Sequence, residues 1–465
     1  MEGTYPLKVL HKKLIAMSKE KIIQHDPLSG RITRTDTPVT VWWMRRDLRL
    51  EDNHALWQAL CTGQPVLPFF VFDRQILDEL NDPEDRRVAF IFSAIEAMDR
   101  RLRDRHQSGI LCLQGKPEEV FVKLLSDYHI VEVFCNEDYE PYAVSRDHRV
   151  EQLLSRRGIP LLRFKDQVIF HKEDLMNAAG NPYTVYTPYS RAWLLKYKEQ
   201  EQLVYPSEKK LHNLLCGIPL LPDMEKIGFH DPGYSFPSSE PDDAVIAHYD
   251  RTRDLPALQN GVTHLGVHLR FGTLSIRKLA LRASLLNETY LKELIWREFF
   301  MQVLWHFPYA AEGPFRKKYA SILWENNEDD FSRWCSGTTG YPLVDAGMRE
   351  LNATGFMHNR VRMITASFLT KHLLIDWRWG EAYFASKLLD YDQAANNGNW
   401  QWVAGTGCDA APYFRIFNPT EQQKRFDPQQ EYIRRWIPEL GSPRYPAPMI
   451  DHAFARQRAL ARYIV

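Results

Sequence analysis

The sequence lacks the usual marks of several protein classes. Its six cysteines are scattered without CxxC spacing, which argues against a zinc site or a disulfide scaffold and fits a reducing setting. No apolar run approaches the length of a membrane span, and the N-terminus has no signal-peptide core. We therefore expect a cytoplasmic protein with no membrane association and no bound metal.

The chain also lacks net charge. Lys and Arg total 59, as do Asp and Glu, and the sequence pI is about 7.3, so there is no global nucleic-acid signature. A local basic patch is compatible with this balance, because electrostatic steering depends on where charge lies.

A chain of 465 residues exceeds what one hydrophobic core usually supports, which predicts two globular domains.

A glycine-rich dinucleotide motif is missing after the first apolar run. From residue 39 onward, short apolar runs alternate with longer amphipathic stretches; the runs are VTVWWM, VLPFFVF, ILCLQ, VEVFC and IPLLRF. This alternation predicts strands separated by helices, hence a doubly wound, Rossmann-like parallel α/β sheet. The first run leads into RRDLRLEDN instead of GxGxxG, which disfavours a nicotinamide-type site there.

Periodicity divides the rest of the chain. We expect a solvated, mildly basic extension at residues 1–37, or an arm that touches nucleic acid, followed by the α/β domain at residues 38–165. Residues 166–245 carry loop-like clusters and are predicted to be a connector lying over both domains. In residues 246–465 apolar side chains recur at spacings of three and four, which predicts an all-helical domain.

Residues 390–402 gather polar and aromatic side chains. They include Asp390, Asp392, Asn396, Asn397 and two tryptophans. Such a set suits a buried polar aromatic ligand, because ring nitrogens need hydrogen bonds and ring faces need stacking partners. A well-capped loop with aromatic core residues is the alternative.

A helical segment carries a second set of this kind. Glu293, Trp296 and Arg297 lie three and four residues apart and therefore share one helix face. They are either a core ion pair beside an indole, or contacts for a flat ligand with an anionic group.

The segment MHNRVRM repeats this spacing with Asn359, Arg362 and Met363. A helical methionine is usually core filler, and a helical asparagine usually faces solvent. Beside Trp296 and Trp402, however, Met363 would complete an apolar pocket with few polar groups, as small-ligand sites generally have.

Three further tryptophans, Trp324, Trp377 and Trp400, lie in separate segments. Tryptophans in such segments usually pack in the hydrophobic core. If their rings nearly touch, they would instead pass an electron stepwise between a redox cofactor and the surface.

Seven segments together resemble one family: VWWMRRDLRLEDN, LRFGTLS, ELIWREFF, TGFMHNRVRMITASFL, LLIDWR, AANNGNWQW and GTGCDAAPYFRIFNP. From Val41 onward the chain is similar to the photolyase/cryptochrome family, and most similar to its class I cyclobutane pyrimidine dimer photolyases. The resemblance implies an antenna-binding α/β domain and a helical domain that holds FAD. It also implies light-dependent DNA repair, in which excited reduced FAD gives an electron to a flipped-out dimer and splits it.

The resemblance implies FAD contacts in the helical domain, namely Tyr249, Thr263, Arg297, Arg362, Asp390, Asp392 and Asn396. A carboxylate can accept a hydrogen bond from the flavin imide, while Asn396 would face the flavin nitrogen that gains a proton on reduction. Val262 and Gly266 stand where the family has Thr or Ser, so backbone N–H groups are expected to serve the phosphates there.

The resemblance also implies contacts to the dimer, namely Glu293, Trp296, Asn359, Met363 and Trp402. Histidines occupy the positions of Asn359 and Met363 in (6-4) photolyases, so repair of that lesion is disfavoured here. A cryptochrome-like blue-light photoreceptor is the other alternative, although Asn396 matches photolyases rather than plant or insect cryptochromes.

Trp400, Trp377 and Trp324 match the proximal, middle and distal members of the family's electron relay. Arg253, Arg360 and Arg415 are expected contacts to DNA phosphates, with surface salt bridges as the alternative. The expected partner is DNA that contains cyclobutane dimers, bound by a monomer and, in a prokaryote, at the nucleoid.

For the antenna pigment of the α/β domain the resemblance leaves alternatives open. Tyr142 and Ala143 stand where folate-binding relatives carry an Asn-Glu pair, so a deazaflavin or a second flavin is favoured over folate. Arg46, Glu137 and Asp138 are its expected neighbours, and an empty site is the alternative.

Overall fold

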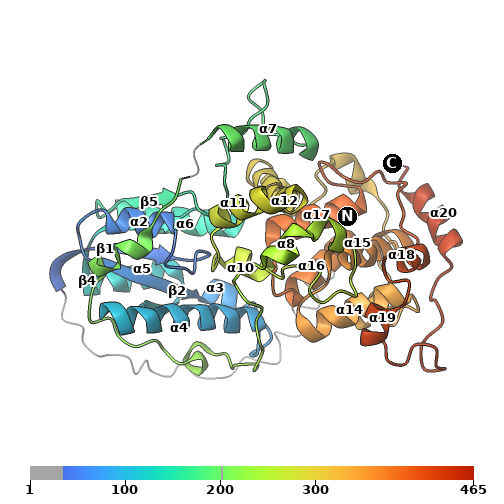
Figure 1. The fold of residues 1–465 in the computed structure, drawn as a ribbon, viewed down its shortest axis with the longest axis horizontal. Coiled ribbons are helices and arrows are strands. Elements are labelled where there is room, and N and C mark those ends of the chain that lie inside the picture. The colour runs from blue at the N-terminus through green and yellow to red at the C-terminus, as the bar shows by residue number, and fades with distance from the viewer. Residues whose placement is uncertain (1–34, 201–202, 465) are drawn as a thin grey trace, which may run out of the picture.

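The structure, a computed structural model, describes residues 35–200 and 203–464. An α/β body and a helical body lie side by side, as Figure 1 shows. Residues 1–34 of the expected N-terminal extension lie outside the described residues, and the expected boundary at residue 38 falls inside the first strand, β1 (Thr35–Met44).

The α/β body is built on a five-stranded sheet whose paired strands are all parallel. The strands after β1 are β2 (Val66–Asp73), β3 (Leu111–Gly115), β4 (Tyr128–Asn136) and β5 (Leu161–Phe164), in the order β3-β2-β1-β4-β5. The predicted doubly wound sheet is confirmed. Its strand order reverses between β1 and β4, the place where such folds commonly bind a ligand.

Helices cover both faces of this sheet. They are α2 (His54–Leu60), α3 (Arg74–Leu77), α4 (Arg86–His106), α5 (Pro117–Asp127) and α6 (Pro141–Ser155). Successive β1 side chains point to opposite faces, so Trp42 packs into the cluster shared with α2 and α4. Its neighbour Trp43 packs with α5 and α6. Burial on both sides explains why the strands read as continuous apolar runs.

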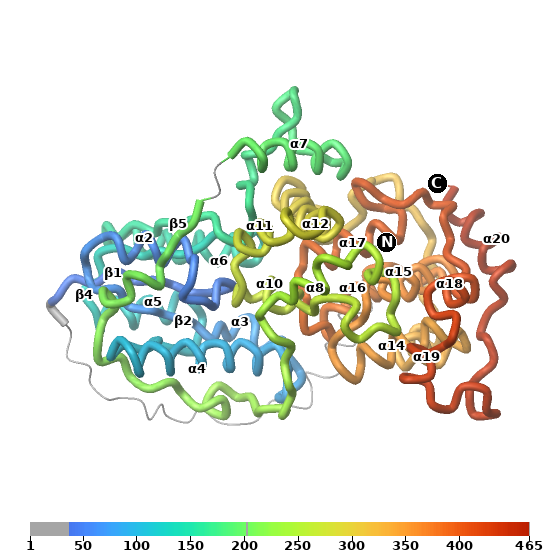
Figure 2. Tube along the Cα trace, in the orientation of Figure 1, coloured from blue at the N-terminus to red at the C-terminus, as the bar shows by residue number. Residues whose placement is uncertain are grey.

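The connector contains a helix that the sequence pattern did not predict, α7 (Tyr186–Glu199). Its buried residues Tyr189, Trp193 and Tyr197 follow one another at spacings of four, a signal carried by aromatic side chains. Three short 3-10 turns follow at Ser207–Lys209, Leu211–Asn213 and Met224–Ile227. Figure 2 shows the chain after α7 passing around the α/β body before it enters the helical body.

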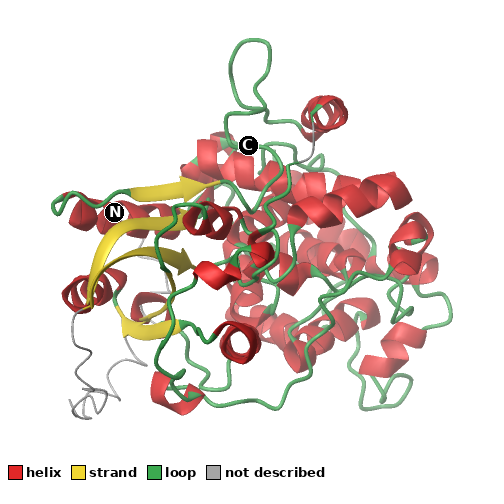
Figure 3. Ribbon diagram, turned by 60° about the vertical axis from the view of Figure 1, so that its left-hand side comes forward, coloured by secondary structure: helices red, strands yellow, loops and turns green. Residues whose placement is uncertain are grey.

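In the described residues of the second body the secondary-structure elements are helices joined by loops, which confirms the prediction (Figure 3). Its helices are α8 (Asp243–Ala247), α9 (Tyr249–Thr252), α10 (Gly266–Phe271), α11 (Ile276–Leu286), α12 (Glu288–His306), α13 (Glu328–Ser336), α14 (Pro342–Thr354), α15 (Asn359–Ser367), α16 (Trp377–Lys387), α17 (Gln393–Ala404), α18 (Pro419–Phe426), α19 (Glu431–Trp436) and α20 (His452–Arg462). Short 3-10 turns at Pro308–Ala311 and Lys317–Ser321 follow α12, and a π-helical turn at Phe368–His372 follows α15. In the described ranges no helix is long and apolar enough to cross a bilayer.

Glu298, in the middle of α12, holds the connector against the helical body. Its carboxylate accepts the backbone N–H groups of Ile169 at 2.6 Å and Phe170 at 3.1 Å. It also accepts the indole N–H of Trp193 at 2.8 Å and the hydroxyl of Tyr189 at 3.2 Å. Burial raises the pKa of Glu298 to about 6, although each of these donors lowers it.

This carboxyl is expected to make stability depend on pH. Because its pKa is higher in the folded chain than in the unfolded chain, its contribution is complete below pH about 4.5 and diminishes as pH rises through about 6. The advantage of the wild type over Glu298→Gln should therefore fall by about 2 kcal/mol between pH 4.5 and pH 7. Thermal melting across this range measures it. Glu312→Gln, at an exposed site, is the control; equal pH profiles for all three proteins would contradict the assignment.

Candidate functional site

A cavity in the helical body gathers side chains from α15, α16, α17 and the turn before α17. We call it the central cavity. It is lined by Asn359, Arg362, Met363, Ala366, Phe384, Leu388, Asp390, Tyr391, Asp392, Ala395, Asn396, Asn399, Trp400 and Val403. Seven of these residues, from MHNRVRM and from residues 390–402, are among those the sequence singled out.

The two carboxylates of the central cavity are oriented by different partners. Asp390 receives the Arg362 guanidinium on both oxygens, at 3.1 Å and 2.9 Å. Asp392 is the N-cap of α17, and its Oδ1 accepts the backbone N–H of Ala395 at 3.1 Å. Local sequence explains this arrangement, because an aspartate before a helix satisfies one of its free N–H groups.

The amide of Asn396 has a defined orientation. Its Nδ2 donates to the backbone carbonyl of Glu381 at 3.1 Å and to the Glu381 carboxyl at 2.8 Å. With both amide hydrogens engaged, the Oδ1 atom is left as an acceptor. Burial raises the pKa of Glu381, and the hydrogen bond from Asn396 lowers it. Glu381 was not singled out by the sequence, since it lies fifteen residues away on α16.

Gly266 lies against the carboxylate of Asp390. A Cβ at this position would stand 2.6 Å from Asp390 Oδ2 and 3.0 Å from Asp390 Cβ. The missing side chain therefore gives Asp390 room. On its other side Asp390 also lines a neighbouring cavity of about 320 Å³, together with His264, Val267, Glu350 and Phe356.

A second cluster joins α9 to α12. Arg253 forms an ion pair with Glu293 at 2.7 Å, and its guanidinium lies 5.4 Å from the ring centroid of Tyr249. Tyr290, which the sequence did not single out, packs edge-on against Tyr249 and bonds the Thr263 hydroxyl at 3.0 Å. Burial raises the pKa of Glu293, and Arg253 opposes that shift.

Trp296 is held by a residue from the connector. The ring of Tyr186 stacks on it with centroids 3.5 Å apart and planes 6° from parallel. The Tyr186 hydroxyl donates to the Lys292 carbonyl at 2.9 Å, and its backbone N–H donates to Asp409 at 2.9 Å. Tyr186 thus fixes one face of Trp296. No sequence spacing could have indicated the pair.

The three relay tryptophans lie in the core and at its edge. Trp400 and Trp377 are each 2% exposed, whereas Trp324 is half-buried. The aromatic ring contacts of Trp400 are with Phe384 at 5.0 Å and with Trp334 at 6.2 Å. Within the described ranges Trp377 makes no such ring contact with Trp400 or Trp324, so the relay stays a prediction.

The other predicted arginines lie outside the central cavity. Arg360 forms an ion pair with Asp254 at 2.6 Å and lies over the ring of Phe426. Arg415 is exposed and lies 5.8 Å from the ring centroid of Trp402. Arg297 donates to two backbone carbonyls, those of residues 167 and 269, at the boundary between the two bodies.

The expected antenna neighbours are engaged elsewhere. Arg46 and Asp138 are buried in ion pairs at the domain boundary, and Glu137 binds His171 at 2.8 Å. Tyr142 donates its hydroxyl to Asp73 at 2.5 Å. Ala143 is buried.

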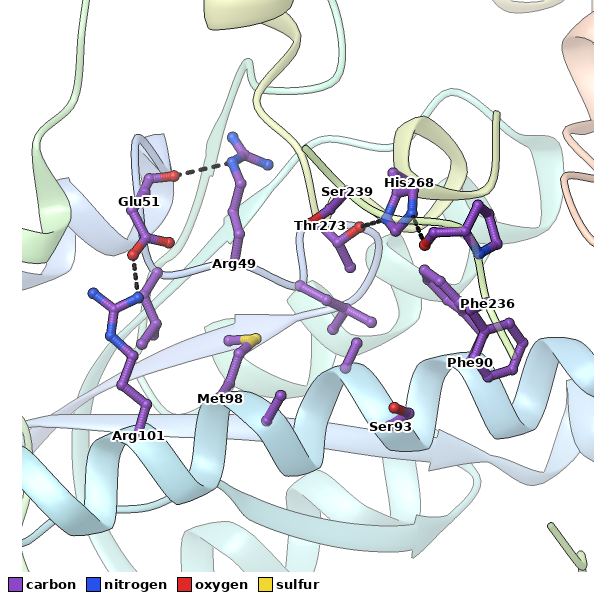
Figure 4. A pocket seen from close by; sticks show the side chains of 15 residues that line it. Arg49, Glu51, Phe90, Ser93, Met98, Arg101, Phe236, Ser239, His268 and Thr273 are labelled. Carbon is purple, nitrogen blue, oxygen red and sulfur yellow. Dashed lines mark hydrogen bonds and ion pairs between the residues drawn. The ribbon is translucent and has the colours of Figure 1, made fainter. Parts of the chain in front are cut away.

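A separate cavity of about 450 Å³ lies between α4, the loop after β1 and the end of the connector (Figure 4). Its floor is apolar, with Phe90, Met98 and Phe236, and Arg101 pairs with Glu51 at its rim. It contains none of the predicted site residues. We therefore take the central cavity as the functional site.

The protein joins a Rossmann-like sheet to a helical domain, and the cavity of the helical domain offers carboxylates, an amide and an indole. This arrangement is that of a two-domain protein that binds an aromatic cofactor. Sequence profiles agree: the one described as DNA photolyase matches residues 40–207, and the one described as the FAD-binding domain of DNA photolyase matches residues 290–443. Among curated proteins, the deoxyribodipyrimidine photo-lyase of Synechococcus sp. is 37% identical over 91% of this chain and 96% of its own. That of Escherichia coli K12 is 36% identical over 90% and 97%. The chain belongs to the DNA photolyase family.

Solved structures agree in fold. A bacterial class III photolyase from Agrobacterium tumefaciens has a TM-score of 0.78 and 31% identity, covering 94% of this chain and 99% of its own. An archaeal photolyase from Sulfolobus tokodaii, solved with two FAD molecules, has a TM-score of 0.78, 32% identity and coverage of 91% and 99%. A cryptochrome from Synechocystis sp. PCC6803 has a TM-score of 0.77, 26% identity and coverage of 94% and 100%.

The packing of Trp400 can be tested through Gly380 of α16. A Cβ at Gly380 would lie 2.1 Å from Trp400 Cη2 and 2.5 Å from Leu369 Cδ2, and neither group is free to move away. Helix propensity alone favours alanine by about 1 kcal/mol. We nevertheless expect Gly380→Ala to cost about 1–3 kcal/mol, seen as a lower melting temperature. Gly313→Ala, where a Cβ meets nothing within 4 Å, is the control. Unchanged melting of Gly380→Ala would contradict this packing.

Proposed function

We propose that this chain repairs DNA with light, as a deoxyribodipyrimidine photo-lyase that uses FAD to split cyclobutane pyrimidine dimers. One observation carries the proposal. The central cavity brings together predicted contacts from MHNRVRM and from residues 390–400, in a chain whose curated relatives are photo-lyases over almost their entire length.

The donors and acceptors of the central cavity fit FAD. Asp390 and Asp392 are acceptors suited to an imide N–H, Arg362 supplies a cation, and the Oδ1 of Asn396 is an acceptor for a protonated ring nitrogen. We assign the flavin to these four residues. Tyr249, Thr263 and Arg297 complete the proposed cofactor set from α9, the loop before α10, and α12.

FAD held by these residues would, in its reduced state and once excited by blue or near-ultraviolet light, supply the electron that splits the cyclobutane ring, and the electron would return to it afterwards. The protein residues hold the dimer for that event. A dimer must leave the duplex first, at a cost of a few kcal/mol, and aromatic faces offset part of this cost by stacking. Trp296 and Trp402 are proposed as these walls.

Glu293 is the proposed polar contact to the dimer. Burial raises the pKa of Glu293, which favours the protonated carboxyl that can donate a hydrogen bond, and the contact with Arg253 orients the side chain before substrate enters. We therefore place Arg253 with the dimer pocket as well as with the DNA backbone. Hydrogen bonding from this site to a pyrimidine carbonyl would stabilise the added charge.

Asn359 and Met363 support cyclobutane repair over (6-4) repair. Both line the central cavity, and neither side chain can donate and regain a proton as histidine does. Their positions therefore suit a reaction that needs electron transfer without acid–base catalysis.

DNA contact outside the pocket is assigned to Arg360 and Arg415. Arg415 lies beside Trp402 and next to Phe414, which is 60% exposed. An exposed cation and an exposed ring next to each other suit a phosphate and an unpaired base. We propose that the protein acts as a monomer in the cell's DNA-containing compartment, with a deazaflavin or flavin antenna rather than folate if it has one.

Repair is tested directly with an oligonucleotide that contains one thymine dimer. Reduced, FAD-loaded protein under blue light is expected to restore both thymines, and protein kept in the dark is not. Glu293→Ala should slow repair about 10²-fold while FAD stays bound, because the variant loses a contact that stabilises the charge added to the dimer. No repair by FAD-loaded, reduced wild type would reject the proposal and favour the photoreceptor alternative.

The relay is tested by separating cofactor reduction from repair. Trp324→Phe is expected to impair light-driven reduction of oxidised FAD and to leave repair by chemically reduced protein intact. Transient absorption of the oxidised indole measures the first step, and product yield measures the second. Trp305→Phe, a half-buried tryptophan elsewhere in the helical body, is the control. An equal loss in both assays would rule out a relay role for Trp324.

A further inference from the structure

Arg46 crosses the boundary between the two bodies. It lies in the loop after β1, and its Nη2 donates to Asp392 Oδ2 in the central cavity, 346 residues further along the chain. Its Nη1 lies 3.1 Å from Asp138 and 3.0 Å from Glu140, and its Nε donates to the Arg270 carbonyl at 3.0 Å. All three guanidinium nitrogens are therefore engaged.

Asp392 is held on both oxygens. Oδ1 caps α17 by accepting the Ala395 N–H, and Oδ2 receives Arg46 together with Arg270 at 3.4 Å. The Ala395 contact comes from the residue's own helix and Arg270 comes from α10, whereas Arg46 comes from the α/β domain. The orientation of this carboxylate therefore depends on both bodies.

The groups around Asp392 form a balanced cluster. The cations are Arg46 from the loop after β1, Arg270 from α10 and Arg297 from α12; the anions are Asp138 and Glu140, which follow β4, and Asp392 itself. Tyr391 and Asp390 precede Asp392 on the same turn, and Asp390 is paired with Arg362. A buried cluster of this kind is stable only when its charges cancel.

The backbone that carries Arg46 is also fixed. Gly272, with φ of +67°, packs on it so closely that a Cβ there would lie 2.1 Å from the Arg46 carbonyl oxygen. Leu48 N–H donates to the Phe271 carbonyl at 3.1 Å, and Arg49 donates to the Gly272 carbonyl at 3.0 Å. The end of α10 is thus docked on the loop that presents Arg46.

This loop follows β1 beside β4, at the point where the strand order reverses. Doubly wound sheets usually bind a small ligand there. Here Arg46 and Asp138 fill that position, and the N-terminus of α17 meets them. The α/β domain presents a side chain to the other body where a ligand crevice would be expected.

We propose that Arg46 is a positioning residue for the flavin, completing the cofactor site from the α/β domain by fixing Asp392 in place and in its charged form. The inference depends on the proposed function only in taking Asp392 as a cofactor contact. Arg46 need not touch the cofactor to act.

The proposal predicts the direction in which the pKa of Asp392 changes when Arg46 is removed. Burial alone would raise the pKa of Asp392, but Arg46, Arg270 and Arg297 together hold it well below its usual range. Loss of Arg46 should let Asp392 take up a proton at a higher pH than in the wild type. Because a protonated carboxyl is a poorer acceptor for the flavin imide, FAD should be released at that higher pH.

The experiment follows FAD retention against pH. FAD-loaded wild type, Arg46→Gln, Arg46→Lys and Arg45→Gln are each equilibrated from pH 8 down to pH 2, and protein-bound flavin is measured after ultrafiltration. Arg45 is the matched control, since it is adjacent and buried but pairs with Asp147 inside the α/β domain. Melting temperatures are recorded in parallel.

The expected result is a release midpoint about 1 pH unit or more higher for Arg46→Gln, as loss of one close opposite charge predicts. Arg46→Lys should recover most of the shift, and Arg45→Gln should lower the melting temperature without moving the midpoint. If Arg46→Gln alone does not fold, Arg46→Gln with Asp138→Asn removes one charge of each sign and should shift the midpoint in the same direction by a smaller amount.

Two results would overturn the inference: an unchanged midpoint in the Arg46 variants, or an equal shift in Arg45→Gln. Both leave the proposed function intact, because the wild type still holds FAD. A wild type that binds no FAD at any pH would instead reject the proposed function itself.

Discussion

Buried guanidinium groups constrain this architecture more than any other feature. Arginine keeps its charge at any ordinary pH, so each one taken out of water must meet acceptors. Arg46 meets Asp392 across the domain boundary, Arg49 meets Asp166 and the Gly272 carbonyl, and Arg297 meets two carbonyls. Burial lowers the pKa of Arg297 to about 10, which still leaves it charged at neutrality. Because these acceptors come from different parts of the chain, the two bodies are held in one relative position.

The central cavity is ordered by contacts made behind its lining. Glu381 orients Asn396, Arg362 holds Asp390, and Tyr186 supports Trp296 outside the cavity. Polar atoms that face a ligand need such support, since a free side chain would lose entropy on binding. The connector takes part in this support through Tyr186 and through its anchor on Glu298. The connector therefore stabilises the site as well as joining the two domains.

Periodicity along the chain predicted the secondary-structure elements whose formation depends on neighbouring residues. The five strands and the long helix α4 were visible as apolar runs and as periodicity, because side-chain direction repeats along each element. The helix α7 was missed because loop-like clusters elsewhere in residues 166–245 suggested a connector without a long helix, while tertiary burial of Tyr189 and Trp193 stabilises helix there. Arg46 and Asp138 were expected beside a pigment, yet they are buried under the helical body, since no local signal reveals a partner in the other domain.

The chain read on its own predicted the fold class, the family and seven of the residues that line the central cavity, because motif order and residue chemistry are written along the chain. Only the tertiary structure decided which residues meet. It paired Arg253 with Glu293, stacked Tyr186 on Trp296, and brought Arg46 to Asp392 across 346 positions. The physical reason is that such contacts depend on the packing of whole elements, and no spacing along the chain encodes the distance between two of them.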